Sequence, residues 1–173
     1  MTRLFSWPRR SNLPGRPASR TDYAGAVYGS LLAASVIVTS SAVGDYPRLQ
    51  LVVALLVTGL VFWAVHVYSR LAGERLVDQR IGWTEAREVG RHEWSIVEAA
   101  VLPAVAVAVS PLLGLGPVGA GWLALSVAVA QQVAWVFLGA LHAGASRTQA
   151  GVEGAVNLVL GLVLVAVKAA LGH

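Results

Sequence analysis

A densely charged segment, residues 62–98, lies between two long apolar stretches, and this arrangement is the main indication of the fold. Its sequence is FWAVHVYSRLAGERLVDQRIGWTEAREVGRHEWSIVE. His66 and Glu98 lie just inside the apolar stretches on its two sides. Ionisable side chains in such stretches are costly in lipid, so they are candidates for a functional site.

The composition indicates a membrane protein. Hydrophobic residues make up 56% of the 173 residues and charged residues only 13%, with a mean hydropathy of +0.66. A soluble domain has roughly 45 to 50% apolar and about 25% charged residues. The sequence has no cysteine, which excludes disulfides, thiolate metal sites and thiol nucleophiles within it.

Five apolar stretches reach the length of about 20 residues that crossing a bilayer requires. They cover residues 23–43, 49–69, 94–113, 118–142 and 152–171. The stretches are continuous rather than alternating, and only helices or closed barrels satisfy every backbone group in lipid. The predicted fold is therefore all-α, a polytopic transmembrane bundle of five spans in one domain, residues 23–171.

Residues 1–22 precede the first span and contain five arginines and three prolines. We expect a disordered basic arm that binds anionic lipid at the cytoplasmic surface. Arg9 and Arg10 alternatively fit a twin-arginine export signal cleaved after Ala42. A signal core has about 7 to 15 residues, which is shorter than this apolar run, and more spans follow, so we favour a retained first span.

The placement of the basic residues predicts the orientation. Of the 13 Arg and Lys residues, five lie in the arm and five in the charged loop, residues 70–93. Cytoplasmic segments are enriched in these residues, so we expect the arm and this loop to be cytoplasmic and the C-terminus external. Topology accounts for the basic excess, and we expect no nucleic-acid partner. The bias towards Arg, Ala, Val and Gly favours a bacterial inner membrane, where we expect a homo-oligomer.

A layer of polar side chains is expected close to the cytoplasmic surface. His66 precedes Arg70 by four residues and Glu98 follows Glu93 by five, so at 1.5 Å per residue both lie about 6 to 8 Å inside the boundary. The same layer contains Tyr28, Asn157 and His142. Neighbouring antiparallel helices usually pack together, so we predict that His66 and Glu98 meet in a proton or ion site, supported by Tyr28 or Asn157.

Purely structural roles are the alternative. His66 would then bond to a nearby carbonyl, and Glu98 would pair with His66 or Arg91. Gln131 and Gln132 are expected to cross-link helices, because an amide in lipid needs a partner.

Several packing features are also predicted. Lys168, near a span end, is expected to be solvated. Small residues at Gly25, Gly29 and Ala33 predict close packing of the first span against another helix. Thr84 is expected to cap a helix that runs without interruption into the third span.

No motif in the sequence names a reaction. It lacks a His-Glu-x-x-His pair, a Gly-rich phosphate loop ending in Lys-Ser/Thr and a Gly-x-Ser-x-Gly elbow, which disfavours an enzyme. The sequence assigns no cofactor and no metal. We expect a small integral membrane protein that moves an ion or small solute or responds to protons through the polar layer. The alternative is a non-transporting scaffold or regulatory subunit of a larger complex.

Overall fold

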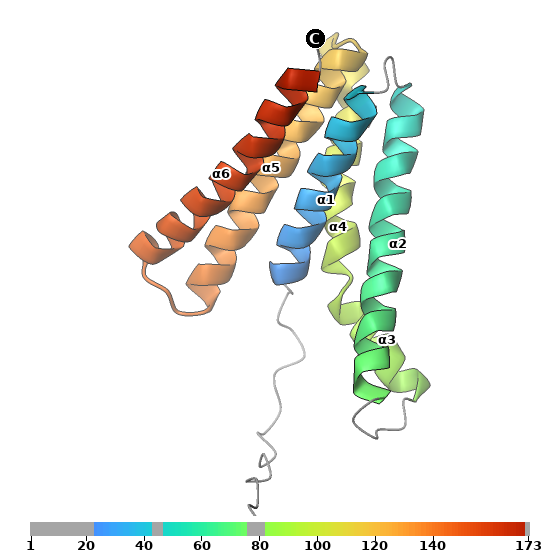
Figure 1. The fold of residues 1–173 in the computed structure, drawn as a ribbon, viewed down its shortest axis with the longest axis vertical. Helices are drawn as coiled ribbons and strands as arrows, with labels where there is room; N and C mark the ends of the chain where they lie inside the picture. The colour runs from blue at the N-terminus through green and yellow to red at the C-terminus, as the bar shows by residue number, and fades with distance from the viewer. Residues whose placement is uncertain (1–22, 43–46, 76–81, 172–173) are drawn as a thin grey trace, which may run out of the picture.

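The computed structural model describes residues 23–42, 47–75 and 82–171 (Figure 1). These residues form six α-helices and one 3-10 helix, without any strand: α1 Tyr23–Ala42, α2 Arg48–Arg75, α3 Trp83–His92, α4 Ser95–Val109, η1 Ser110–Leu113, α5 Pro117–His142 and α6 Arg147–Leu171. Five spans, in α1, α2, α4 with η1, α5 and α6, are long and apolar enough to cross a membrane. The predictions of an all-α fold and of five helices long and apolar enough to span a membrane are therefore confirmed.

The long helices run alternately up and down the bundle (Figure 1), so α1 begins at one end and α6 finishes at the other. We call the end where α1, α4 and α6 begin the Arg70 end. Helix α1 packs against α2, α4, α5 and α6, whereas α2 packs mainly against α4. Towards the Arg70 end, α5 and α6 diverge from α2 and α3 (Figure 1).

Small residues set the distances between these helices. A Cβ atom on Gly29 of α1 would lie 2.7 Å from the Ile96 carbonyl oxygen and 2.8 Å from the Ala99 Cβ atom of α4. On α2, a Cβ on Gly59 would lie 3.1 Å from the Cβ of Ala100. Close backbone approach provides the van der Waals packing that associates helices in lipid. The predicted close contact at Gly29 is confirmed, and it lies within one chain.

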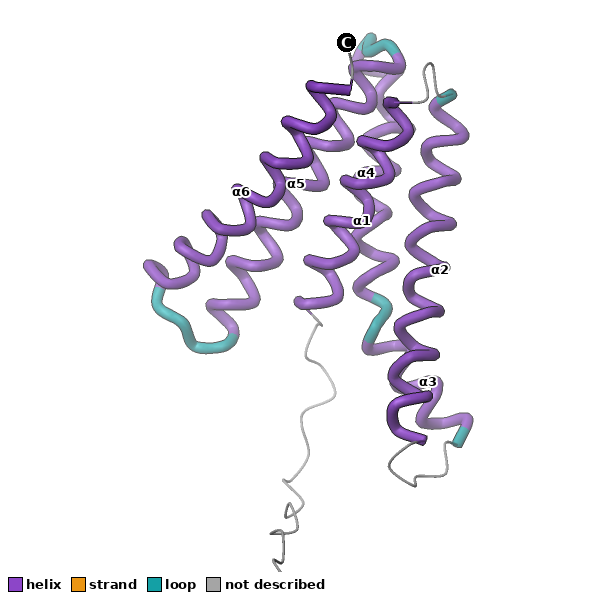
Figure 2. The backbone as a smooth tube through the Cα atoms, in the orientation of Figure 1, coloured by secondary structure: helices purple, strands orange, loops and turns teal. Residues whose placement is uncertain are grey.

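The charged segment is more helical than predicted. Helix α2 continues to Arg75, and α3 begins at Trp83 with Gly82, not Thr84, at its N-cap. The predicted uninterrupted helix into the third span is also wrong, because a turn at Glu93 and Trp94 separates α3 from α4 (Figure 2). The basic arm and residues 76–81 lie outside the described residues.

Side-chain contacts hold α3 against α2. The indole Nε1 of Trp63 donates to the Gly90 carbonyl over 2.8 Å, and the Trp63 and Trp94 rings meet edge to face with centroids 5.5 Å apart. Arg70 Nε lies 2.8 Å from Oε1 of Glu93, whose side chain is 3% exposed. This ion pair is close but poorly aligned, because Oε1 has no hydrogen-bond partner of acceptable geometry in the described part of the chain. The buried carboxylate of Glu93 therefore lies at the turn between α3 and α4, against Arg70 of α2.

Local polar contacts start α6. The Ser146 backbone N–H donates to Gln149 Oε1 over 3.0 Å, and the Gln149 N–H donates to Ser146 Oγ over 3.2 Å. This reciprocal pair satisfies backbone donors at the helix start. Gly144, with φ 90°, supplies the left-handed residue that turns the chain after α5.

Lys168 of α6 is buried, so the expectation that it is solvated is wrong. Its ammonium lies 5.3 Å from the centroid of the Trp122 ring on α5. A cation over an indole face is attracted to the ring electrons. The long side chain therefore packs against the neighbouring helix at the end of the bundle opposite Arg70.

Candidate functional site

Pro103 creates a local need for a hydrogen-bond donor in α4. Proline has no N–H, so the carbonyl four residues earlier, that of Ala99, loses its usual intrahelical donor. The side-chain Nε2 of Gln131 on α5 donates to this carbonyl over 3.3 Å. An amide from the adjacent helix thus replaces the missing bond, as irregular backbone in a membrane segment requires.

Three further polar atoms near this bond are buried. Ser95 Oγ, Gln131 Oε1 and Trp135 Nε1 have no hydrogen-bond partner among the described residues. Ser95 and Gln131 are only 5% and 8% exposed. Buried polar groups are usually paired, and unpaired ones often mark functional positions or bound water. We call Ser95, Glu98, Gln131 and Trp135 the polar junction.

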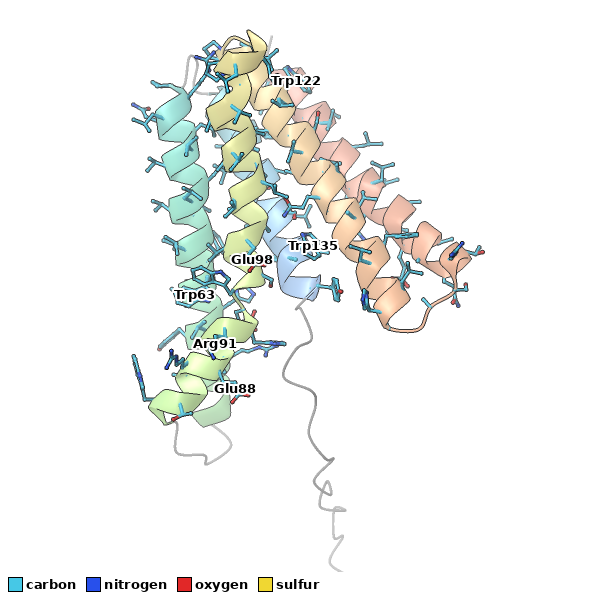
Figure 3. The ribbon with its side chains drawn as sticks, turned by 180° about the vertical axis from the view of Figure 1, so that it is seen from behind. Trp63, Glu88, Arg91, Glu98, Trp122 and Trp135 are labelled. Atoms are coloured by element: carbon cyan, nitrogen blue, oxygen red, sulfur yellow. The ribbon has the colours of Figure 1, made fainter. Side chains whose placement is uncertain are left out.

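The register of α4 and α5 places these residues within one helical turn. The two helices are antiparallel, so from the bond between Gln131 and Ala99, both Ser95 and Trp135 lie four residues, or about 6 Å, towards the Arg70 end. Glu98 lies between these two levels. Figure 3 shows Glu98 on the side of α4 towards α5, with Trp135 across from it and α1 behind.

Glu98 is the acidic residue of the junction. Its side chain is exposed in the protein alone and forms no hydrogen bond or ion pair with any described residue. It lies in the first turn of α4, where the helix dipole favours a negative charge. Glu98 lies within a predicted span, and no described residue occupies its carboxylate, so the carboxylate can bind a proton or a cation.

Aromatic side chains border the junction at the Arg70 end. The rings of Tyr23 and Trp135 lie with centroids 5.9 Å apart, and Tyr23 stacks on His142 at 5.5 Å. The Nδ1 atom of His142 lies 2.8 Å from the Leu138 carbonyl and 3.2 Å from the Tyr23 hydroxyl. Because a carbonyl only accepts, Nδ1 must carry the proton in that bond. His142 thus ties α5 to the start of α1.

His66 meets Tyr28 rather than Glu98 in the described residues. The His66 and Tyr28 ring centroids are 5.0 Å apart, and His66 Nδ1 lies 3.3 Å from the Phe62 carbonyl. No hydrogen bond or ion pair joins His66 to Glu98, both of which are described. The contact with Phe62 is of the kind expected for a structural histidine. The participation of His66 in a proton site stays a prediction.

Asn157 belongs to a contact between α5 and α6. Gln132 Nε2 lies 3.2 Å from both the backbone oxygen and Oδ1 of Asn157. Asn157 Nδ2 donates to the Glu153 carbonyl over 3.2 Å. Both glutamines therefore cross-link helices, as predicted: Gln131 joins α5 to α4, and Gln132 joins α5 to α6.

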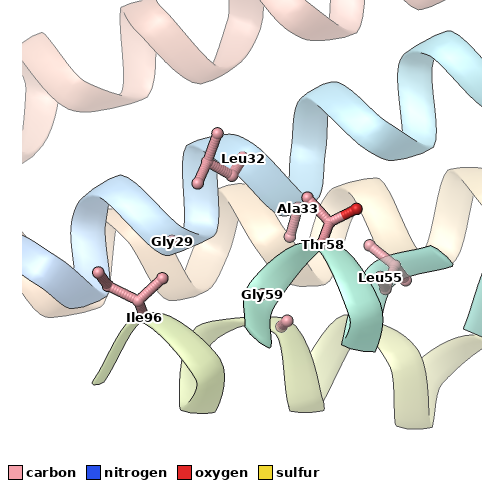
Figure 4. Close-up of a pocket in the computed structure, with 8 residues that line it drawn as sticks. Gly29, Leu32, Ala33, Leu55, Thr58, Gly59 and Ile96 are labelled. Carbon is pink, nitrogen blue, oxygen red and sulfur yellow. The ribbon is translucent and has the colours of Figure 1, made fainter. Parts of the chain in front are cut away.

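A separate pocket lies between α1, α2 and α4 (Figure 4). Its lining is apolar except for Thr58 and includes Gly29, Gly59 and Ile96. It has no space for a water molecule. This pocket is a packing defect beside two close helix contacts and offers no chemistry.

The described residues contain no group of three or more His, Asp or Glu side chains that could hold a metal ion. No family model, no curated protein and no solved structure matches the sequence. The chain is therefore of the class of small multi-pass helical membrane proteins, and one of its spans carries a carboxylate that faces a helix with buried, unpaired polar atoms.

The sequence predicted Glu98 as a site residue and Gln131 as a cross-link between helices, but it assigned neither Ser95 nor Trp135 to the site. Of the predicted layer, Tyr28 meets His66, while His142 and Asn157 each bond to other helices. Ser95 and Trp135 were missed, because a serine and a tryptophan near a span end have ordinary structural roles. The sequence did contain one relevant signal. Pro103 has no N–H, so the Ala99 carbonyl loses its intrahelical donor and needs a donor from another helix.

Proposed function

We propose that this chain is a small integral membrane protein that moves an ion or small solute, or responds to protons, through the polar layer at the Arg70 end. The Arg-rich distribution favours a cytoplasmic location for that end and a bacterial inner membrane for the protein. The expected partners are the lipid bilayer, with anionic lipid at the basic arm, and further copies of the chain.

The observation that supports this function is the environment of Glu98. A carboxylate in a membrane span is costly, and such residues commonly line ion pathways or proton relays. Glu98 has no ion-pair partner among the described residues, and it lies on the side of α4 towards α5, with Trp135 across from it (Figure 3). Helix α5 carries the buried, unpaired atoms Gln131 Oε1 and Trp135 Nε1. A cation or proton that reaches Glu98 would neutralise the charge, and the polar atoms would compensate for lost hydration.

Purified protein in liposomes tests the proposal. Imposed gradients of protons, sodium or potassium should each be assayed, and at least one should yield a flux that Glu98→Gln reduces about tenfold or more. Glu153→Gln is the matched control, because Glu153 is an exposed carboxylate of α6 at the same end. Absence of flux with every ion, together with pH-independent folding stability, would reject both the transport and the proton-response forms.

A second function is a non-transporting scaffold or regulatory subunit. The exposure of Glu98 in the isolated chain favours it, because another protein's basic side chain would then supply the missing ion partner. In that case the protein should co-purify with a specific membrane partner, and Glu98→Gln should release that partner without any effect on ion flux.

A further inference from the structure

The polar junction contains one unpaired donor and one unpaired acceptor on the same face of α5. The Nε1–H of Trp135 can only donate. The orientation of the Gln131 amide follows from its partner: the Ala99 carbonyl accepts, so Nε2 faces it and Oε1 is left as an acceptor. Gln131 and Trp135 are four residues apart, so their side chains lie one turn apart along α5.

Glu98 lies between the levels of these two side chains and can complement either one, depending on its charge. An ionised carboxylate only accepts, which matches the Trp135 donor. A protonated carboxyl carries an O–H, which matches the Gln131 acceptor. The side chain of Glu98 is exposed, and no hydrogen bond or ion pair to a described residue fixes its conformation.

We propose that Glu98 exchanges hydrogen-bond partners on α5 when it binds a proton. The charged form accepts from Trp135 Nε1, and the protonated form donates to Gln131 Oε1. This inference rests on the proposed function and specifies it: the ligand is a proton, and α5 is the helix that responds. The two partners lie about 6 Å apart along α5. Protonation therefore moves the hydrogen bond between Glu98 and α5 by one helical turn along α5.

Other titratable groups near α4 must be separated from Glu98 in any test. At the Arg70 end, the packed helices contribute Tyr23 and Tyr28 from α1, His66, Tyr68 and Arg70 from α2, and His142 from α5, and Glu93 precedes α4. The residues of η1 carry no titratable side chain. The described residues include no hydrogen bond or ion pair from any of these groups to Glu98.

The indole N–H resonances of protein labelled with nitrogen-15 tryptophan, in detergent micelles, provide a direct test. Trp135→Phe assigns the Trp135 resonance by its disappearance. In the parent protein this resonance should move in a single step as pH falls, because its acceptor is withdrawn, and the step should disappear in Glu98→Gln. Glu153→Gln should retain it. A resonance that does not titrate, or a step that survives in Glu98→Gln, would overturn the proposal.

Two further measurements keep the outcome decisive. His66→Ala and His142→Ala should leave the Trp135 step in place, and its loss in either variant alone would assign the titration to that histidine. Infrared difference spectra should show a protonated carboxyl band at low pH that is absent in Glu98→Gln.

If the resonance titrates as expected but flux is independent of Glu98, the transport proposal fails while partner exchange stands. If flux depends on Glu98 without a Trp135 step, partner exchange fails alone.

Discussion

The side-chain amide of Gln131 donates over 3.3 Å to the carbonyl of Ala99. Pro103 leaves this carbonyl without an intrahelical donor, so one residue of α5 repairs a defect in α4. The same bond fixes which end of the amide faces α4, and it therefore positions the unpaired Oε1 atom of the polar junction. The Gln131 side chain thus both pairs the Ala99 carbonyl and contributes an unpaired acceptor to the candidate site.

The bond between Gln131 and Ala99 should couple energetically to Pro103. Pro103→Ala restores the backbone N–H, so Gln131→Leu should cost about 1 kcal/mol more in the parent than in the Pro103→Ala background. Gln131→Leu also removes the unpaired Oε1 atom, but it does so in both backgrounds, so this contribution cancels from the difference between the two costs. Unfolding with sodium dodecyl sulfate in mixed micelles measures all four proteins. Equal costs in the two backgrounds would show that Gln131 does not replace the missing donor.

Gly29 should tolerate no side chain. Its Cβ would approach a backbone oxygen of Ile96 to 2.7 Å, and backbone cannot move aside as a flexible side chain can. Gly29→Ala should lower the free energy of unfolding by about 1 to 3 kcal/mol, and Gly29→Leu by more. Thermal unfolding in detergent measures the effect. Gly73→Ala is the control: nothing lies within 4 Å, so alanine should stabilise α2 by about 0.5 to 1 kcal/mol.

The ion pair of Arg70 and Glu93 should show strong non-additivity. Arg70→Met removes the partner of a carboxylate whose side chain is 3% exposed, and this should destabilise the protein clearly. The double variant Arg70→Met and Glu93→Met should recover most of the lost stability, because no buried charge then remains. Melting temperatures of the parent and three variants decide the matter. A double variant as unstable as the sum of the singles would contradict the pairing.

The orientation of the bundle can be tested by reporter fusions. We expect the arm, residues 1–22, and the charged loop, residues 70–93, to be cytoplasmic and His173 to be external, because these two segments contain ten of the 13 basic residues. A reporter active only in the cytoplasm should therefore give signal when inserted at residues 76–81 and none after His173. Full signal after His173 would reject the five-span orientation.

The polar layer should make the protein sensitive to pH. Histidine side chains change charge between about pH 5 and 8, so flux, or stability if no flux exists, should vary in that range. His66→Ala and Glu98→Gln should each reduce this variation. His92→Ala is a useful control, since His92 lies on α3 outside the spans. An unchanged pH profile in both site variants would leave His66 and Glu98 with structural roles at most.

Local composition is enough to predict the class of fold. Long uninterrupted apolar runs can satisfy their backbone groups in lipid only as helices, so the five spans follow from local composition. Close packing at Gly29 could also be predicted from the sequence, because a residue without a side chain permits close backbone approach whichever helix is the neighbour.

Which side chains meet depends on how the helices pack. Depth along a helix follows from residue number, but the direction in which a side chain points across the bundle depends on how the helices rotate and tilt as they pack. His66 and Glu98 share a predicted depth, yet His66 contacts Tyr28. The bonds from Gln131 to Ala99 and from Gln132 to Asn157 join residues of different helices, and no local pattern encodes which residues they connect.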